Sequence, residues 1–125
     1  ILKIDGIHKT GNAFLLSITN TSEFGNHAYI APLADAQDGF MDIGLVRRIP
    51  WHSIPLNTFR LFRKKLHHSK YYQHFKAKKA SVFLNQPSAM HIDGEAYVME
   101  GTVEIENLPN SLVMIPGIDF KQKMQ

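Results

Sequence analysis

The chain has 125 residues and a mass of 14.2 kDa, with 44% hydrophobic, 20% charged and 10% aromatic residues. That length suits one domain with one core, and the composition excludes a disordered or fibrous chain. No apolar run approaches the roughly 20 residues of a membrane-spanning helix, and none has the form of a secretory signal. The absence of cysteine excludes disulfides and thiolate metal sites, and it fits a reducing cytosol.

Charge is unevenly distributed along the chain. Residues 43–92 hold no Asp or Glu, but they hold ten Lys and Arg and five of the seven His. The flanks hold four Lys and all eleven acids, so the formal charge of +3 conceals a strongly basic middle between acidic ends. A basic segment attracts the phosphate groups of lipids, nucleotides or nucleic acids, although a solvated helix face gives the same pattern.

In chain order, apolar runs predict strands at residues 1–7, 13–19, 27–31 and 41–49. A helix is predicted over residues 54–66, where Leu56, Phe59, Phe62 and Leu66 recur every three or four residues. That spacing places Phe59 and Phe62 in the core. After a lysine-rich segment, strands are predicted at residues 80–84, 96–105 and 112–115. The result is a mainly β domain with one main helix.

Two carboxylates, Asp35 and Asp38, lie three residues apart and precede Gly39. Carboxylates this close, together with nearby backbone carbonyls, can bind Mg²⁺, which prefers oxygen ligands. An Asp-Gly pair is first of all a turn, so a plain turn explains the same residues.

A second Asp-Gly pair, Asp93-Gly94, lies between apolar runs and predicts a hairpin. Glu95 follows directly, and a tight turn would aim its carboxylate rigidly, as a general base requires. The turn alone again explains Asp93 and Gly94. Three clustered histidines lack the glutamate of a zinc motif and are assigned to the basic surface: His67, His68 and His74.

Together, these segments resemble the diacylglycerol-kinase and sphingosine-kinase-like lipid kinases, most of all the bacterial soluble lipid kinases. The resemblance covers residues 13–116 and rests on order and spacing. It is carried by Gly25-Asn26, Ile30-Ala31-Pro32, Ala34, Asp38-Gly39, Met41-Asp42-Ile43, Ala77-Lys78-Lys79-Ala80, Asp93-Gly94-Glu95 and the tail 108–116.

In that family, a nucleotide-binding domain with a Gly-Gly-Asp-Gly-Thr loop precedes this region. This chain has no Gly-rich phosphate loop and opens at Ile1 inside an apolar stretch. The resemblance therefore implies that residues 1–125 are the C-terminal, antiparallel, β-sandwich-like domain of a two-domain lipid kinase. Residues from about 108 to 125 are expected to pack back toward the missing half.

The resemblance also implies roles for single residues. Glu95 matches the proton acceptor for the lipid hydroxyl, and Asp93 and Gly94 form its supporting turn. Asp38 matches a Mg²⁺ ligand, with backbone carbonyls near Asp35 and Phe40 completing the site. Asp35 departs from relatives that have an apolar residue there, so whether its side chain or only its carbonyl would bind is open.

The implied activity is ATP-dependent transfer of the γ-phosphoryl group to a lipid hydroxyl, diacylglycerol-like or sphingosine-like. Mg²⁺ is the expected cofactor, ATP is bound mainly by the missing half, and this fragment alone is predicted to be inactive. We expect a cytoplasmic protein, peripheral at an anionic membrane, that binds its lipid substrate and its own nucleotide-binding domain but no nucleic acid; a homodimer is left open. Headgroup contacts are assigned to Arg60, Arg63, Lys64, Lys65 and Lys70. The candidates for the lipid boundary are Phe59, Phe62, Tyr71, Tyr72 and Phe75, although the helical spacing favours core positions for Phe59 and Phe62.

Two other function classes fit the composition. One is a basic β-rich module that binds nucleic acid or anionic surfaces without catalysis; the other is a solitary β-sandwich binding domain. The nucleic-acid hypothesis has no binding signature to support it, and it leaves both Asp-Gly segments unexplained.

Overall fold

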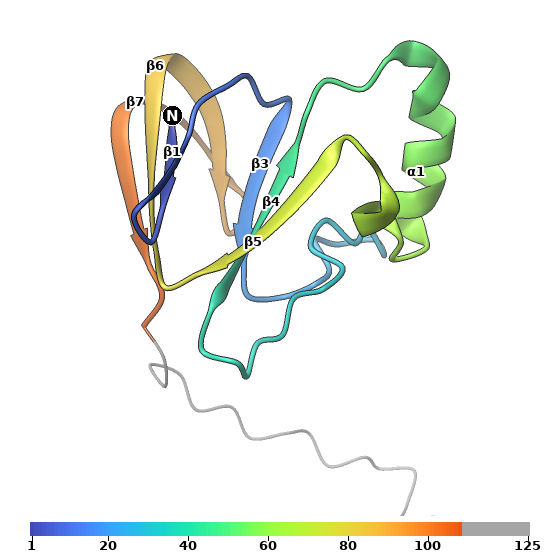
Figure 1. Cartoon of the computed structure of the whole chain (residues 1–125), viewed down its shortest axis with the longest axis horizontal. Coiled ribbons are helices and arrows are strands. Elements are labelled where there is room, and N and C mark those ends of the chain that lie inside the picture. The colour runs from blue at the N-terminus through green and yellow to red at the C-terminus, as the bar shows by residue number, and fades with distance from the viewer. Residues whose placement is uncertain (109–125) are drawn as a thin grey trace, which may run out of the picture.

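The computed structural model describes residues 1–108 of the chain, which form two antiparallel sheets and one main helix (Figure 1). The strands are β1 (Leu2–Ile4), β2 (Ile7–Lys9), β3 (Leu15–Thr19), β4 (Met41–Val46), β5 (Tyr72–Ala77), β6 (Lys79–Ile92) and β7 (Glu95–Glu106). The helix is α1 (Ile54–Phe62), flanked by single 3₁₀ turns at Trp51–Ser53 and Leu66–His68. One sheet has the order β2-β1-β6-β7 and the other β3-β4-β5. The predicted fold, mainly β and sandwich-like with one main helix, is confirmed.

Two Asp-Gly pairs make tight hairpins. Asp5 and Gly6 have φ angles of 41° and 88°, and Asp93 and Gly94 have φ angles of 50° and 90°. Two successive residues with positive φ form the type I′ turn, whose twist matches that of antiparallel strands. The hairpin predicted at Asp93-Gly94 is confirmed. The single strand predicted over residues 1–7 is wrong, because Asp5-Gly6 divides it into β1 and β2.

The chain crosses between the sheets at Lys78, the one residue between β5 and β6. The Asp5 carboxylate fixes this corner, since it accepts the backbone N–H groups of Lys78 at 3.2 Å and Lys79 at 3.0 Å. The lysine-rich segment, for which no strand was predicted, therefore contains β5 and the start of β6. Its polar residues at 73, 74 and 76 hide the strand from an analysis of apolar runs.

The main core lies between the two sheets. Its buried members come from both sheets: Leu2, Ile4, Met41, Ile43, Ala77, Ala80 and Val82. Since side chains alternate along a strand, Met41 and Ile43 face this core while Asp42 and Gly44 face the other side of β4. The three-stranded sheet therefore has a second covered face.

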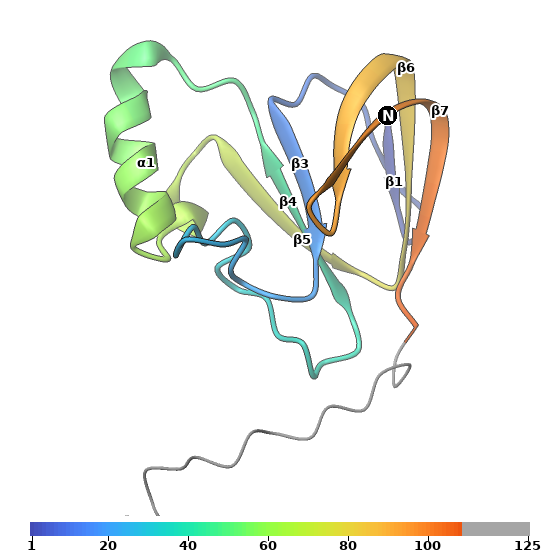
Figure 2. The ribbon, with the colours of Figure 1, turned by 180° about the vertical axis from the view of Figure 1, so that it is seen from behind.

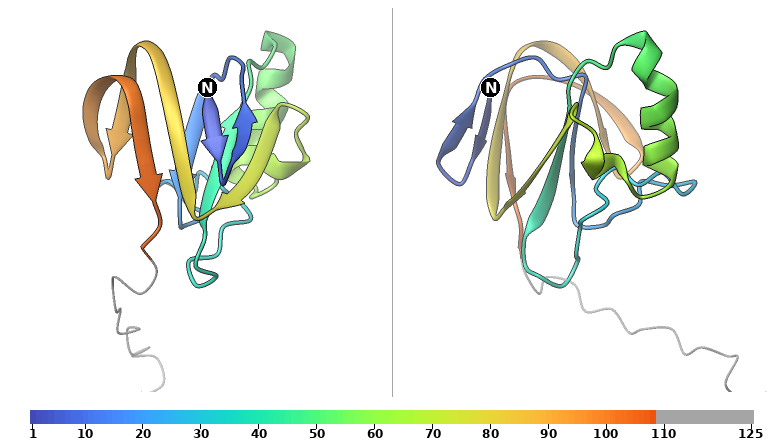
Figure 3. Two further views of the ribbon diagram at one scale, coloured as in Figure 1. Left: turned by 60° about the vertical axis from the view of Figure 1, so that its left-hand side comes forward. Right: turned by 45° about the vertical axis from the view of Figure 1, so that its right-hand side comes forward.

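Residues 28–34 and α1 cover that second face (Figures 2 and 3). The buried side chains there are Ile30, Ala31, Val46, Leu66 and Tyr72. The backbone N–H of Tyr29 donates to the carbonyl of Leu61 at 3.1 Å, which joins this covering segment to α1. The strand predicted over residues 27–31 is wrong: the segment is apolar because it is buried, but it forms only an isolated bridge, Gly25 to Ala28.

The helix is shorter than predicted and is turned differently. Its buried residue is Asn57, whose Nδ2 donates to the Ser53 carbonyl at 2.7 Å and whose Oδ1 accepts the Ser69 hydroxyl. Leu61 packs on the second core cluster from the same side of α1. Phe59 and Phe62 lie on the opposite side and are 57% and 50% exposed, so the prediction that they are core residues is wrong. The strand predicted at 112–115 lies outside the described residues.

Candidate functional site

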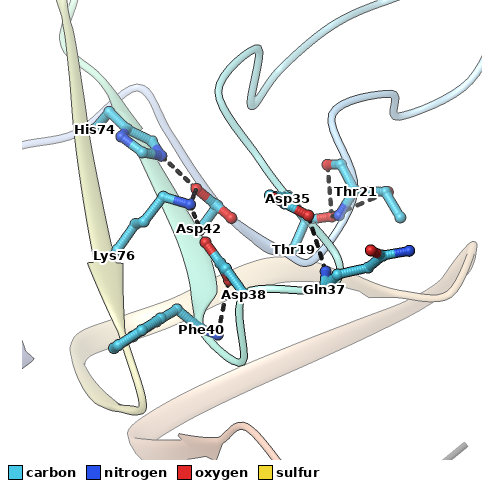
Figure 4. Close-up of polar contacts among 9 residues, drawn as sticks. All are labelled: Thr19, Thr21, Asp35, Gln37, Asp38, Phe40, Asp42, His74 and Lys76. Atoms are coloured by element: carbon cyan, nitrogen blue, oxygen red, sulfur yellow. Dashed lines mark hydrogen bonds and ion pairs between the residues drawn. The ribbon is translucent and has the colours of Figure 1, made fainter. Parts of the chain in front are cut away.

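A polar cluster around one buried carboxylate lies on the helix-side face of β4 and β5. Asp42 on β4 is paired with Lys76 on β5, and Gly44 with His74, so Asp42, His74 and Lys76 share one face. Asp42 is fully buried. Its Oδ1 accepts the Nε2–H of His74 at 2.6 Å and lies 3.6 Å from the Lys76 ammonium (Figure 4). The pairing of strands thus supplies two partners to a carboxylate that water does not reach.

Lys76 joins this cluster to the predicted metal turn. Its ammonium also pairs with Oδ2 of Asp38, while Oδ1 of Asp38 accepts the backbone N–H of Phe40 at 2.9 Å (Figure 4). The hydrogen bond from Lys76, and then that from Phe40, holds the pKa of Asp38 below its usual value. The Asp38 hydrogen bond in turn raises the pKa of Lys76. Lys76 therefore bridges the turn to the sheet.

Asp35 lies on the same turn, but its side chain is used locally. Its Oδ1 accepts the backbone N–H of Gln37 at 2.9 Å, an Asx turn. On the other side, Asn107, just after β7, donates its Nδ2–H to the carbonyl of Gly39 at 2.8 Å. The turn that carries Asp35 and Asp38 is therefore fastened to β5 by Lys76 and to the end of β7 by Asn107.

Tyr72 closes the buried face over Gly44. A side chain at Gly44 would place its Cβ 2.8 Å from the Tyr72 hydroxyl oxygen and 3.2 Å from the carbonyl oxygen of Ile30. Glycine is therefore required for Tyr72 to pack here. Burial, with the nearby Asp42 charge adding to it, raises the pKa of Tyr72 to about 12.

Tyr72→Phe is expected to remove a decrease in the free energy of unfolding that the wild type shows at alkaline pH. An unfolded tyrosine ionises near pH 10, so between about pH 10 and 12 the unfolded phenol releases its proton while the folded one keeps it. The contribution of Tyr72 is thus complete below about pH 10, and roughly 2 kcal/mol of it is lost as the pH rises toward 12. Urea unfolding of both proteins near pH 8 and pH 11.5 measures the difference. Tyr71→Phe, at a half-exposed position, is the control; equal alkaline slopes for wild type and Tyr72→Phe would contradict the assignment.

Glu95 lies at the first position of β7, at the tip of the β6–β7 hairpin, where it is exposed. Tyr97 is two residues further on the same strand and therefore on the same face. Its hydroxyl donates to Oε2 of Glu95 at 2.7 Å, and this hydrogen bond raises the pKa of Tyr97. Tyr97 was missed in the sequence analysis, although its spacing of two from Glu95 on a predicted strand is a usable signal.

The two predicted sites are separate in the described part of the chain. Asp35, Asp38 and Phe40 share one turn, as predicted, and that turn lies beside the Asp42 cluster, which was not predicted. No hydrogen bond or ion pair within residues 1–108 joins Glu95 to Asp38. The structure thus places the metal candidates on one turn, where Asp38 pairs with Lys76, and it presents the candidate base on the hairpin.

The predicted headgroup contacts all lie on α1 or just after it. Arg63, Lys64, Lys65 and Lys70 are exposed, and Arg60 is half-exposed. Of the aromatic candidates for a lipid boundary, Tyr72 is buried and Phe75 packs against the main core, so these two predictions are wrong. Tyr71 is half-exposed, with the Lys70 ammonium 5.2 Å from its ring centre.

A family model described as the YegS C-terminal NAD kinase beta sandwich-like domain matches residues 1–116. The chain belongs to this family. The predicted relationship to the C-terminal domain of diacylglycerol-kinase-like proteins is thereby confirmed. Among curated proteins, no sequence matches the chain at a significant level.

Two solved structures share the YegS C-terminal fold of this chain. The first is "a putative diacylglycerol kinase from Bacillus anthracis str. Sterne", with a TM-score of 0.64 and 20% identity over 85% of this chain and 36% of that one. A second crystal structure under the same description has a TM-score of 0.64 and 19% identity, over 85% of this chain and 37% of that one. The likeness establishes the fold, and the present chain spans little more than a third of those proteins.

In this YegS-type domain, the turn at residues 35–40 has the donor chemistry that Mg²⁺ prefers, namely carboxylate and carbonyl oxygens. Within residues 1–108, no three His, Asp or Glu side chains lie close enough together to hold a metal ion. A site at this turn would therefore need backbone carbonyls beside Asp38, as predicted. The ion would also replace the Lys76 ammonium, which now neutralises the Asp38 carboxylate.

Over the same described residues, no helix of this YegS-type domain has the length and apolar character to cross a membrane.

Proposed function

We propose that this chain is the lipid-substrate domain of an ATP-dependent lipid kinase, which transfers the γ-phosphoryl group to a lipid hydroxyl. The observation that carries the proposal is the placement of Glu95. A rigid type I′ turn presents its carboxylate at a hairpin tip, with Tyr97 holding one of the two oxygens, in a chain that belongs to the YegS C-terminal family. Both structural relatives are called "putative diacylglycerol kinase", which supports a diacylglycerol-like acceptor.

Glu95 would act as the general base. As the lipid hydroxyl oxygen forms a bond to the γ-phosphorus, the bond from that phosphorus to the bridging oxygen breaks and ADP leaves. The hydroxyl proton passes to Glu95. Tyr97 occupies Oε2, so Oε1 is the oxygen that would face the hydroxyl. Phosphoryl transfer depends on alignment and charge compensation more than on covalent catalysis by the protein. This domain therefore needs to supply only a positioned base and a positioned acceptor hydroxyl.

The remaining requirements fall on the turn and on the other half of the protein. Asp38, with the carbonyls of Asp35 and Phe40, would hold Mg²⁺. When bound, Mg²⁺ would supply positive charge between this turn and the neighbouring domain. ATP would be bound mainly by an upstream nucleotide-binding domain. The cations on and after α1 would face anionic headgroups. In this proposal the protein is cytoplasmic and peripheral at the membrane.

Reconstitution tests the proposal. The chain joined to an upstream nucleotide-binding half should transfer labelled phosphate from ATP to diacylglycerol or a sphingoid base in detergent micelles, and chelation of Mg²⁺ should abolish transfer. The 125-residue chain alone should show none. Phosphorylated lipid from the chain alone would contradict the two-part arrangement. A joined protein that binds ATP but labels no lipid acceptor would contradict the proposed function.

A further inference from the structure

The outward side of α1 carries large apolar side chains that nothing in the described part of the chain covers. Phe59 and Phe62 are 57% and 50% exposed, and Trp51 in the preceding turn is 83% exposed. Two aliphatic neighbours are also about half exposed, so we define the apolar helix surface as Trp51, Ile54, Leu56, Phe59 and Phe62. Single exposed apolar residues are ordinary, but five within twelve residues are a concentration of the kind that marks an interaction site.

Cations lie at the C-terminal end of this surface. The Arg63 guanidinium lies 5.3 Å from the ring centre of Phe59, and the Lys64 ammonium lies 5.7 Å from that of Tyr29. No acid occurs in residues 43–92. Over residues 1–108, neither Arg63 nor Lys64 takes part in an ion pair.

The way in which α1 is anchored explains why its aromatic side chains face outward. The helix is held from its inner side by the polar bonds of Asn57 to Ser53 and Ser69, together with the packing of Leu61. A helix anchored in this way does not need its aromatic residues for the core. Those residues are free to face outward while the cations gather at and after the helix C-terminus, where they also complement its dipole.

We infer that α1 and the turn before it insert into the boundary between headgroups and acyl chains of an anionic bilayer. The apolar helix surface enters the boundary, and Arg63, Lys64 and Lys65 lie at the level of the lipid phosphates. Apolar and aromatic side chains on one side with cations beside them are the pattern of helices that lie in a membrane interface. Single-stranded nucleic acid is bound mainly through cations and aromatic rings, so the aliphatic side chains of Ile54 and Leu56 favour a bilayer as the partner. This inference rests on the proposed function only in that a lipid kinase must meet its acceptor at a bilayer.

Trp51 is the one tryptophan of the chain and therefore a native probe. On addition of phosphatidylglycerol vesicles to the 125-residue chain, its emission is expected to shift to shorter wavelength. Phosphatidylglycerol brominated along its acyl chains should quench it. Phosphatidylcholine vesicles should bind more weakly, and added salt should narrow that difference because it screens the cations. An emission spectrum that phosphatidylglycerol leaves unchanged would overturn the inference.

The double variant Phe59→Ala/Phe62→Ala is expected to lower partition into phosphatidylglycerol vesicles by about tenfold or more, because it removes two exposed rings from the inserted side. Both positions are exposed, so circular dichroism should show an unchanged fold. Val98→Ala is the matched control, since Val98 is 76% exposed but lies on β7 in the other sheet, and its partition should equal that of wild type.

Two results would overturn the inference: equal partition of wild type and the double variant, or a Trp51 shift that the upstream half alone produces without lipid. The second result would make this surface an internal interface of a longer chain. Neither measurement uses ATP or phosphoryl transfer. A failure here is therefore distinguishable from a failure of the kinase proposal, which is tested in micelles.

Discussion

Glu95→Gln is expected to lower the rate of lipid phosphorylation by the joined, two-half protein by about 10²–10⁴-fold, the usual contribution of a general base. Glutamine has nearly the shape of glutamate and can still accept the Tyr97 hydroxyl hydrogen bond, so the hairpin tip should keep its structure. What it cannot do is take the proton of the lipid hydroxyl. The loss should therefore fall on kcat, with the KM for the acceptor nearly unchanged.

The matched control is Glu100→Gln, which makes the same substitution at an exposed position further along β7. It should leave the rate unchanged. Tyr97→Phe should give a smaller loss than Glu95→Gln, because it releases the carboxylate without removing it. Lipid phosphorylation by Glu95→Gln at the wild-type rate would show that Glu95 is not the base.

The sequence predicts most of what local chemistry determines. An Asp-Gly pair between two apolar runs favours the type I′ turn, in which both central residues have positive φ, so the hairpin at Asp93-Gly94 could be predicted. The same dipeptide at Asp5-Gly6 was passed over because the flanking strands, β1 and β2, are only three residues each. Order and spacing of short segments were enough to identify the family, because those segments are turns and buried stretches, such as Met41–Ile43 in β4, whose geometry or packing restricts the residue types allowed.

Tertiary context decides the rest. The strand β5 has no apolar run, because the face of the sheet that it helps to form is partly polar. On that face, Tyr72 is followed by His74 and not by another apolar residue. The periodicity of α1 is correct, but an apolar stripe does not reveal which side of the helix is anchored; here the buried side holds Asn57. The Asp42 cluster was missed because its members, far apart in sequence, meet only through the register of β4 and β5.

The largest effect on stability is expected at this cluster. His74→Ala removes the partner 2.6 Å from Oδ1 of Asp42 and leaves a fully buried carboxylate with only Lys76, at 3.6 Å. Leaving a buried charged group short of a hydrogen-bond partner costs about 1–3 kcal/mol or more, so we expect a loss of about 3 kcal/mol in the free energy of unfolding. His91→Ala, at an exposed position on β6, is the control and should stay within about 0.5 kcal/mol of wild type.

A double-mutant cycle separates the pair from simple loss of packing. Asp42→Asn removes the charge that needs His74, so His74→Ala in that background should cost less than in wild type, with a coupling of about 1–3 kcal/mol. His74→Ala should also draw Lys76 toward Asp42 and away from Asp38. Faster hydrogen exchange at the Phe40 amide, which donates to Asp38, would report the loosened turn. A His74→Ala variant as stable as His91→Ala, with an unchanged Phe40 amide, would mean that Lys76 alone satisfies Asp42 and that the turn is held independently of the buried cluster.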